Sequence, residues 1–311
     1  MYYFIVNYTG GSGRARKTWN EVHKNLKLKG VTYKAYVTKY KGHATRLAEK
    51  ISSLNDDDIR IVVVGGDGSI NEVLNGIRDF SKVKLGVIPT GSGNDFARGL
   101  DIPSDPEEAL DMILNSVGNH CIDLGKVITE EGLPHIFGIS SGIGLDAIVC
   151  KKAIGSKVKR VLNGIKLGKL TYLVLTVHTL FSMETYNVKV VTTLKDGSKT
   201  ETVDYKNLIF LAAMNFRCEG GGVPMNPNAR PDDGLLSICA VSDIPKLKTF
   251  FLLPVLVAAK HGNKKGFELK NVKKLEFSAD RPMVLHANGE YVGDVRQIEM
   301  DIIPDAIRVL T

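Results

Sequence analysis

Two short glycine-rich segments of the sequence combine backbone freedom with a carboxylate, a pairing suited to phosphate chemistry. The first reads G-G-D-G over residues 65–68 and directly follows the apolar run 61–64. A strand that turns through glycines into a helix exposes backbone N–H groups, and the helix N-terminus adds partial positive charge, so a phosphate can bind there. Asp67 fits beside phosphates if it helps to hold Mg²⁺, which offsets charge on a transferred phosphoryl group. For this segment alone, an ordinary tight turn with a capping Asp or Ser is an equally good interpretation.

The second segment, T-G-S-G-N-D over residues 90–95, follows the next predicted strand. Open α/β sheets bind ligands at the carboxyl ends of strands, so two such loops on adjacent strands favour a nucleotide site. A third segment, Asn7–Gly13, is also glycine-rich, and the basic residues Arg14, Arg16 and Lys17 after it could face phosphates or lipid head groups. None of the three matches G-x-x-x-x-G-K-[ST] or G-x-G-x-x-G, which argues against a P-loop and a dinucleotide fold.

These loops need a sheet to position them, and residues 1–125 have the pattern of one. Short β-branched runs alternate with helical periodicity, which predicts a doubly wound α/β nucleotide-binding domain. Asp105 and Pro106 mark the start of its last helix as N-cap and first helical residue. The predicted strands are Tyr3–Val6, Tyr33–Val37, Ile59–Val64 and Lys84–Ile88, and the predicted helices are Ala15–Lys27, His43–Leu54, Ser69–Ile77 and Asp105–Leu114.

From residue 126 to 311 the period changes to two, which predicts an antiparallel β-sandwich domain with helical inserts. A hairpin turn is expected at Lys195–Gly197. The pattern leaves open whether the last residues return to the first domain. The predicted strands are Phe137–Ser140, Val188–Thr193, Leu208–Ala213, Leu235–Ala240, Lys274–Ser278 and Gln297–Ile302, and the predicted inserts are Ser156–Leu180 and Pro245–His261.

The composition is that of a folded chain with a mild basic excess. Of the 311 residues, 43% are apolar and 24% charged, and the net charge is +7, which favours anionic partners. The excess is concentrated between Lys151 and Lys169, a stretch without an acidic residue. We therefore expect a basic surface there.

The cysteines and the apolar runs exclude several classes of protein. The four cysteines lack C-x-x-C spacing, which argues against zinc and a disulfide framework and predicts reduced, buried thiols. The N-terminal residues read as a first strand and not as a signal peptide. The longest apolar run, Phe250–Ala259, is too short to span a bilayer. We therefore expect a cytoplasmic protein without a transmembrane helix.

Residues 65–76 (G-G-D-G-S-I-N-E-V-L-N-G) and 89–100 (P-T-G-S-G-N-D-F-A-R-G-L) together closely resemble the catalytic domain of diacylglycerol kinases. The resemblance is to the soluble bacterial lipid kinase branch, which is related to sphingosine and ceramide kinases. It continues in the family's order at residues 142–147, 230–235 and 288–290, and it covers nearly the whole chain. The resemblance implies a Mg²⁺-dependent kinase that transfers the γ-phosphate of ATP to a lipid hydroxyl.

The resemblance also implies roles for matching positions. Asp67 and Asp95 would lie beside the phosphates and the catalytic Mg²⁺, and Glu290 would be the general base that takes the proton from the lipid hydroxyl. Asp146 would meet the substrate head group, although an Asp before a strand is often only a cap or turn residue. The nucleotide would contact Asn7, Tyr8, Thr9, Gly10, Gly11, Thr38, Gly66, Asp67, Gly68, Ser69, Ile70, Asn71, Glu72 and Ser92.

Family members hold a structural Mg²⁺ in the second domain. Here it would fall to the carboxylate of Asp233 and the backbone carbonyls of Arg230 and Leu235, with a polar hairpin turn as the alternative. One departure bears on this site, because the family's D-G-E reads Asn288-Gly-Glu290. Asn keeps one acceptor oxygen but loses the charge, which puts the affinity for this metal and the orientation of Glu290 in doubt. Tyr8 replaces a usual Pro, a milder change.

A lipid acceptor implies contact with a bilayer. The run Lys151–Lys169 is the expected contact with anionic lipids, with a solvated basic face as the alternative, whereas Phe250–Ala259 is more simply a core helix than an inserted one. We expect an enzyme peripheral to the inner face of the membrane, no nucleic-acid partner, and a homodimer as the base-rate expectation. Two rivals stay open: an NAD kinase-like or other soluble-acceptor kinase, and a non-catalytic nucleotide- or lipid-binding regulator.

Overall fold

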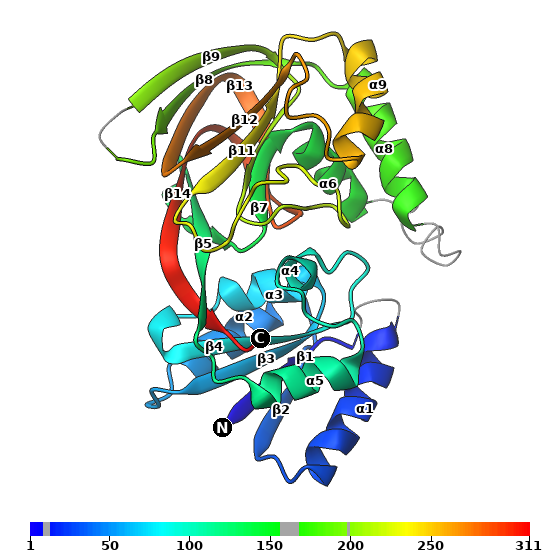
Figure 1. Cartoon of the computed structure of the whole chain (residues 1–311), viewed down its shortest axis with the longest axis vertical. Helices are drawn as coiled ribbons and strands as arrows, with labels where there is room; N and C mark the ends of the chain where they lie inside the picture. The colour runs from blue at the N-terminus through cyan, green and yellow to red at the C-terminus, as the bar shows by residue number, and fades with distance from the viewer. Residues whose placement is uncertain (9–12, 156–167, 198–199) are drawn as a thin grey trace. The chain divides into compact units, whose positions relative to one another are not determined.

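The computed structural model describes residues 1–8, 13–155, 168–197 and 200–311, which form two compact units (Figure 1). Unit 1 comprises Met1–Leu124 and Pro304–Thr311, and unit 2 comprises Gly125–Ile303. The chain therefore passes from one unit to the other twice. Of the sequence predictions, those for Thr9, Gly10, Gly11 and residues 156–167 fall outside the described residues.

Unit 1 is built on a parallel sheet in the order β2-β1-β3-β4, with the end of β14 added beside β4. Its strands are β1 (Tyr2–Val6), β2 (Tyr33–Val37), β3 (Ile59–Gly65), β4 (Val83–Pro89) and the last residues of β14 (Glu290–Val309). Residues 61–65 of β3 are all buried, as expected for a strand covered on both faces. The predicted ends of the first four strands are correct to within one residue.

Helices cover both faces of this sheet (Figure 1). On one face, α1 (Arg14–Leu28) and α5 (Pro106–Asn115) share a core with Phe4 and Val62. On the other lie α2 (His43–Ser52) and α3 (Asp67–Leu74), which pack together. The short helices η2 (Phe80–Lys82) and α4 (Asp95–Gly99) flank β4. As predicted, the Asp105 carboxylate caps α5 by accepting hydrogen bonds from the N–H groups of Glu107 and Glu108.

Helix α3 begins two residues earlier and ends three residues earlier than predicted. It ends early because the chain passes very close to α2 at Gly76. A Cβ atom at this position would lie 2.1 Å from the backbone oxygen of Thr45. Only glycine allows this approach.

Unit 2 is mostly antiparallel, with strands in the order β12-β11-β10-β7-β13-β14, β8 and β9 extending from β13, and β6 paired with β5. β13 changes partner from β8 to β7 after an irregularity between Ser278 and Met283. The strand bounds are β5 (His120–Thr129), β6 (Pro134–Phe137), β7 (Ser140–Gly144), β8 (Tyr186–Thr193), β9 (Thr200–Leu208), β10 (Phe210–Met214), β11 (Leu236–Val241), β12 (Phe267–Val272) and β13 (Lys274–Ala287).

Several strand predictions in unit 2 need correction. The segment predicted as Phe137–Ser140 is the end of β6 and the start of β7, and β13 and β14 are much longer than predicted because they pair with each other. Strands β5, β9 and β12 were not predicted. β9 shows why, since most of its side chains are exposed and apolar residues do not alternate along it.

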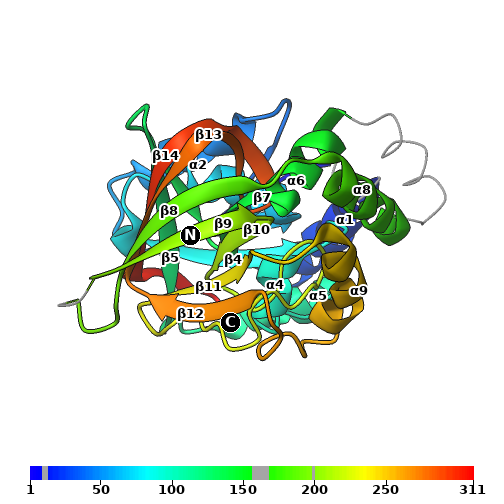
Figure 2. The ribbon, with the colours of Figure 1, turned by 90° about the horizontal axis from the view of Figure 1, so that it is seen from above.

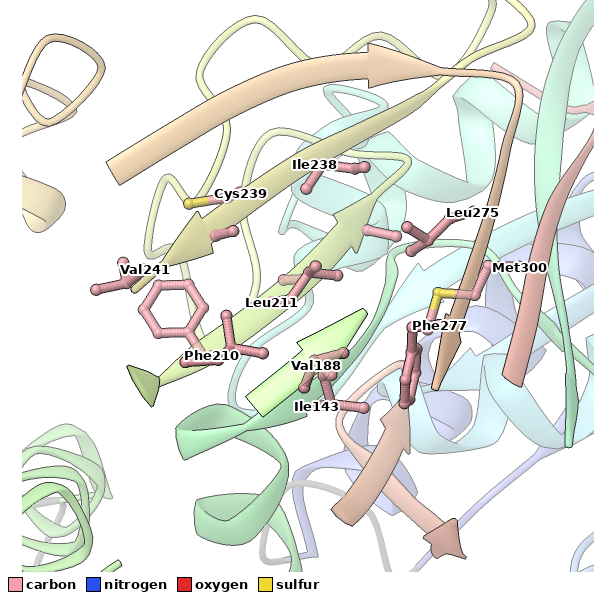
Figure 3. Close-up of a cluster of buried hydrophobic side chains, with 14 of the residues drawn as sticks. Ile143, Val188, Phe210, Leu211, Ile238, Cys239, Val241, Leu275, Phe277 and Met300 are labelled. Atoms are coloured by element: carbon pink, nitrogen blue, oxygen red, sulfur yellow. The ribbon is translucent and has the colours of Figure 1, made fainter. Parts of the chain in front are cut away.

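The core of unit 2 joins side chains from strands that lie far apart in the sequence (Figure 3). Phe210, Ile238 and Leu275 come from β10, β11 and β13 and are almost fully buried. Burying each side chain of this size contributes about 1.5–3 kcal/mol. This core fixes the strands that surround a cluster of polar residues in unit 2.

The helices of unit 2 are α6 (Leu145–Gly155), α8 (Gly168–Ser182) and α9 (Lys246–Val257). The first of the two predicted inserts, Ser156–Leu180, starts too late in the sequence and so missed α6. As a result, Asp146 lies in the first turn of a helix and does not precede a strand. A carboxylate in this position is favoured by the helix dipole.

Helix α9 was predicted to be a core helix, and this holds for one side only: Leu256 is buried in the core of unit 2, and Phe250 and Leu252 pack against that core. Leu247, Phe251 and Val257 are 60%, 67% and 62% exposed. α9 lies beside α8 in two perpendicular views (Figures 1 and 2), and the rings of Phe181 and Phe250 are 6.0 Å apart. The two helices thus present apolar side chains to solvent.

In the part of the chain that the structure describes, no helix combines the length and the apolar character needed to cross a membrane. All four cysteines are free thiols, as predicted, but only Cys239 is buried.

Candidate functional site

The polar residues of unit 1 gather at the carboxyl ends of β1, β3 and β4. In the sheet order β2-β1-β3-β4, β2 lies on one side of β1, whereas β3 and β4 lie on the other side. The strand order therefore reverses between β1 and β3. Ligands of open α/β sheets bind at such a switch point. The loops that begin at Asn7 and Gly66 follow the two strands that define it.

The two glycine-rich loops touch backbone to backbone. A Cβ atom on Gly66 would lie 2.8 Å from the Cα atom of Gly91, and one on Gly91 would lie 2.7 Å from the Cα atom of Gly66. The N–H of Thr90 donates to the carbonyl oxygen of Gly65 at 2.8 Å. The side chain of Asn94 closes the second loop by accepting from the N–H of Gly91 at 2.8 Å. Only glycine at both positions permits this contact.

Asp67 and Asp95 form a close pair of carboxylates at this contact. The two oxygens of Asp67 accept hydrogen bonds from the N–H groups of Asp95 and Phe96, both at 3.1 Å. Burial and the nearby charge of Asp95 raise the pKa of Asp67, and its backbone hydrogen bonds oppose the increase. Asp95 is 5% exposed and pairs with Arg98. Two carboxylates that repel each other are a suitable donor set for Mg²⁺, because a hard cation prefers oxygen ligands and offsets their charge.

Two further predicted residues tie neighbouring loops to α3. The Ser69 hydroxyl accepts a hydrogen bond from the Asn7 amide at 2.9 Å, which fixes the start of the loop after β1. The Glu72 carboxylate accepts from the N–H groups of Gly42 and Ala44, at 2.8 and 3.1 Å, and so caps the N-terminus of α2. Both residues therefore hold the loops of the site in place.

The remaining predicted nucleotide contacts differ in exposure. Thr38 and Gly68 are partly buried, Ser92 is exposed, and Ile70 and Asn71 are buried within α3. Tyr8 is partly buried, and the guanidinium of Arg16 lies 6.0 Å from the centre of its ring.

One polar residue of these loops was missed. The hydroxyl of Thr90 is buried and has no hydrogen-bond partner among the described residues. A buried hydroxyl without a partner is costly. Only its place in the second glycine-rich loop could have drawn attention to it.

Unit 2 has its own polar cluster, made of Asp146, Glu219 and His286. One side-chain atom of each lies within 4.8 Å of the others. The Nε2 atom of His286 is 3.0 Å from Asp146 Oδ2 and 4.0 Å from Glu219 Oε2, and the Ser140 hydroxyl donates to Glu219. Gly142 makes room for the cluster, since a Cβ atom there would lie 2.6 Å from Asp146 Oδ2.

The charges of this cluster shift the pKa values of the groups inside it. Burial lowers the pKa of His286, but the carboxylates of Asp146 and Glu219 raise it, and the net direction is upward. Burial, with the same two carboxylates, raises the pKa of the Cys239 thiol. The other oxygen of Asp146, Oδ1, is buried and lacks a partner within the described chain.

A tight hairpin between β13 and β14 carries Glu290. Its loop residues, Asn288 and Gly289, both have positive φ, 50° and 75°, and Ala287 pairs with Glu290 across the turn. Asn and Gly are the preferred pair for such a two-residue turn. The Asn288 side-chain oxygen accepts from the N–H groups of Gly138 and Ile139 at 3.0 and 2.8 Å. Asn288 is therefore well suited to this turn.

Glu290 is partly buried and lies close enough to His135 of β6 to affect its ionisation. Burial lowers the pKa of His135, and the charge of Glu290 partly offsets this. His135 was not predicted as a site residue. It is separated from Glu290 by more than 150 positions in the sequence, so only the fold reveals the pairing.

Asp233 lies in a turn before β11. Its Oδ1 atom accepts a hydrogen bond from the N–H of Leu235 at 3.1 Å, Gly234 has φ of 68°, and Arg230 pairs with Asp232. A carboxylate and two carbonyls are oxygen donors of the kind that Mg²⁺ binds. These residues also form a stable turn by themselves.

Comparison with known proteins identifies the family. The diacylglycerol kinase catalytic domain matches residues 1–127, and the YegS C-terminal NAD kinase beta sandwich-like domain matches residues 141–311. The chain belongs to the diacylglycerol kinase family. Both predictions made from the sequence, the family and the α/β-plus-β-sandwich fold, are confirmed, and so is the classification as a kinase.

Relatives within this family match over nearly their whole length. A Bacillus subtilis protein named "Putative lipid kinase YtlR" is 28% identical and covers 100% of this chain and 99% of its own. A diacylglycerol kinase from Staphylococcus saprophyticus is 26% identical over 93% of this chain and 88% of its own. A crystal structure named as that of "a putative diacylglycerol kinase from Bacillus anthracis" has a TM-score of 0.74 at 22% identity, covering 99% and 96% of the two chains. The structural similarity supports the fold.

Proposed function

We propose that this diacylglycerol kinase family member transfers the γ-phosphate of ATP to the hydroxyl of a membrane lipid. The observation that carries the proposal is the pair Asp67 and Asp95, held where two glycine-rich loops touch at the switch point of the sheet. Phosphoryl transfer needs placement and charge neutralisation more than covalent chemistry, and this arrangement provides both.

Unit 1 is the proposed ATP-binding part. The free backbone N–H groups at residues 66–68, where α3 begins, would face the phosphates, together with Ser92, Thr38 and the loop from Asn7 to Gly11. Asp67 and Asp95 would hold the catalytic Mg²⁺. When bound, the metal offsets the negative charge that develops on the transferred phosphoryl group. The unpartnered hydroxyl of Thr90 is a further candidate donor to the nucleotide.

Unit 2 is the proposed acceptor-binding part. Glu290 would take the proton from the acceptor hydroxyl, which increases its nucleophilicity toward phosphorus. Asp146 would bind the head group, a role supported by its buried and unpartnered Oδ1 atom. A hydroxyl or amine of the acceptor would satisfy that oxygen.

A second Mg²⁺ is proposed for the turn of Asp233, with the carbonyls of Arg230 and Leu235. Its role would be to stabilise the turn before β11. Because Leu235 already donates to Asp233, the metal would add to an existing turn and not create it.

The helices α8 and α9 are the proposed surface for an anionic bilayer. Leu173, Val174 and Phe181 of α8 are 53%, 59% and 49% exposed, and α9 adds its three exposed apolar residues. Neither helix contains an acidic residue, and four exposed lysines flank the apolar part of α9: Lys248, Lys260, Lys264 and Lys265. Apolar side chains bordered by lysines suit shallow insertion among anionic lipids.

Most of the run Lys151–Lys169 lies outside the described residues, but the first two lysines of the run have partners in unit 2. The ammonium of Lys151 pairs with Asp294 at 2.7 Å and lies 4.6 Å from the centre of the Tyr291 ring. Lys152 donates to Thr179 at 3.1 Å. Lys151 and Lys152 are therefore engaged within unit 2.

Vesicle binding tests the surface. The double variant Leu247→Ser/Phe251→Ser should bind phosphatidylglycerol vesicles at least about tenfold more weakly, since burying each side chain is worth about 1.5–3 kcal/mol. Leu28→Ser is the matched control, because Leu28 of α1 is 74% exposed in the other unit. Equal binding by the double variant and the control would exclude α9 as the contact.

The function itself is tested by transfer of labelled γ-phosphate from ATP and Mg²⁺ to a panel of lipid hydroxyls in mixed micelles. NAD is included, because the family of the β-sandwich is described as NAD kinase-like. Wild type should label one lipid, and Asp95→Asn should lose about 100-fold or more of that activity. Label in NAD would establish the soluble-acceptor alternative, and ATP binding without transfer to any acceptor would establish a regulator.

A further inference from the structure

His286 lies at the centre of the unit 2 cluster and four residues before Glu290. It is 1% exposed, and both of its ring nitrogens have partners. Nε2 is 3.0 Å from Asp146 Oδ2, and Nδ1 accepts a hydrogen bond from the N–H of Gly289 at 3.3 Å. One side chain thus connects the first turn of α6 to the hairpin that carries Glu290.

The Gly289 contact defines the protonation state that this geometry requires. A backbone N–H can donate only to a ring nitrogen that carries no proton. Nδ1 must therefore be unprotonated, and the proton of the neutral ring lies on Nε2, where it points at Asp146. Gly289 is the second residue of a two-residue turn, so its N–H lies outside the strand ladder and is available to this acceptor.

We propose that His286 is a positioning residue for Glu290, acting through the hydrogen bond from Gly289 to Nδ1 while Asp146 holds the ring in the Nε2–H tautomer. The inference rests on the proposed role of Glu290 as the base. Gly289 is adjacent to Glu290, so loss of the bond frees the backbone immediately before the carboxylate. A displacement of about 1 Å at a reacting group can cost about 100-fold in rate.

The surroundings of His286 support a fixed ring. Asp146 is anchored because α6 is also tied to β14 by the ion pair of Lys151 with Asp294. Glu219 approaches Nε2 to 4.0 Å and is itself held by Ser140. Together with the Cys239 thiol of β11, whose pKa responds to both carboxylates, these are the titratable groups around the ring.

The same three residues could also be considered as ligands of a metal ion. A metal on Nε2 would require the proton on Nδ1, where it would face the N–H of Gly289. The hydrogen bond to Gly289 therefore favours the positioning role. We therefore expect the protein to keep its full activity and its His286 NMR signals after metals are removed with a chelator and Mg²⁺ alone is added back.

Two variants separate the two ring nitrogens. The side-chain oxygen of Asn reaches roughly the position of Nδ1, and the amide nitrogen of Gln reaches roughly that of Nε2. His286→Asn keeps an acceptor for Gly289, whereas His286→Gln keeps only a donor for Asp146. We expect kcat to fall about tenfold or more further in His286→Gln than in His286→Asn, with KM for ATP unchanged in both.

His261 provides the matched control, since it is fully buried in the same unit and its Nε2 lies 2.9 Å from the Met225 carbonyl oxygen. Its Asn and Gln variants should lower stability without any difference in kcat between them. Equal kcat losses in the two His286 variants, or the same difference at His261, would overturn the proposal.

The ring nitrogens give a direct readout that does not depend on activity. In ¹⁵N-histidine-labelled wild type at alkaline pH, Nδ1 of His286 should have the chemical shift of an unprotonated nitrogen and Nε2 that of a protonated one. The opposite tautomer would exclude the Gly289 bond. Full activity of Glu290→Gln would show that Glu290 is not the base, but it would not change the tautomer of His286. Failure of the proposed function and failure of this inference are therefore distinguishable.

Discussion

The two units build their polar sites in different ways. In unit 1 the loops are fixed by the contact of Gly66 with Gly91 and by hydrogen bonds from the backbone to Asp67 and Glu72. In unit 2 the cluster consists of two buried side chains, from β13 and the loop after β10, and one partly buried side chain from α6. A site made of backbone tolerates few residue types, whereas a site made of side chains depends on how distant segments pack. Substitutions should therefore affect the two parts of the reaction separately.

Glu290→Gln should separate the proposed acceptor chemistry from ATP binding more than any other substitution. Gln keeps the shape of Glu but cannot accept a proton, and a general base contributes about 100- to 10,000-fold to rate. We expect kcat to fall in this range while ATP binding stays unchanged, as measured by labelled phosphate transfer and by calorimetry. Unchanged turnover would remove Glu290 from its proposed role.

Asn288→Ala should disturb unit 2, the proposed acceptor-binding part, through its hairpin. The change leaves the N–H groups of Gly138 and Ile139 without their acceptor, at about 1–3 kcal/mol each, and places Ala at positive φ. A loss of about 2–6 kcal/mol in the free energy of unfolding is expected from urea titration. Asn288→Asp is the control, because it keeps the acceptor, and it should lose less than about 1 kcal/mol.

Two glycine substitutions compare the units directly. Gly91→Ala places a Cβ atom 2.7 Å from Gly66, and Gly142→Ala places one 2.6 Å from Asp146. Each should cost about 1–3 kcal/mol of stability through overpacking. Steady-state kinetics should show a raised KM for ATP only in Gly91→Ala, and altered acceptor kinetics only in Gly142→Ala. The same kinetic change in both variants would contradict the division of labour.

The smallest effect concerns pH. The pKa of His286 is raised in the folded state, so its contribution to stability is present below about pH 6.5, the unfolded value, and is lost as pH rises through the folded value. Activity should change in the opposite direction, because protonation of Nδ1 removes the acceptor for Gly289. Thermal unfolding and kcat, measured across pH for wild type and His286→Asn, should show both trends only in wild type.

The sequence predicted unit 1 better than unit 2 for a physical reason. Glycines and carboxylates that follow buried strands are visible as local patterns, and the first four strands of unit 1 were predicted to within one residue. The cluster around His286 joins residues 146, 219 and 286, whose proximity depends on pairing of distant strands. Strand β9 and helix α6 were missed because neither has a clear apolar periodicity, and α9 was assigned to the core because its apolar run alone does not show which face is covered.

The strand β14 has a consequence for biosynthesis. Its last residues, Arg308 and Val309, complete the edge of a sheet whose other strands are made near the start of translation. Domains usually fold in the order in which they are synthesised. In this chain the edge of β4 therefore stays uncovered until the end of β14 has been made, after all other strands of both units. Unit 1, the proposed nucleotide-binding part, is therefore begun before unit 2 and completed only after the residues of unit 2 have been translated.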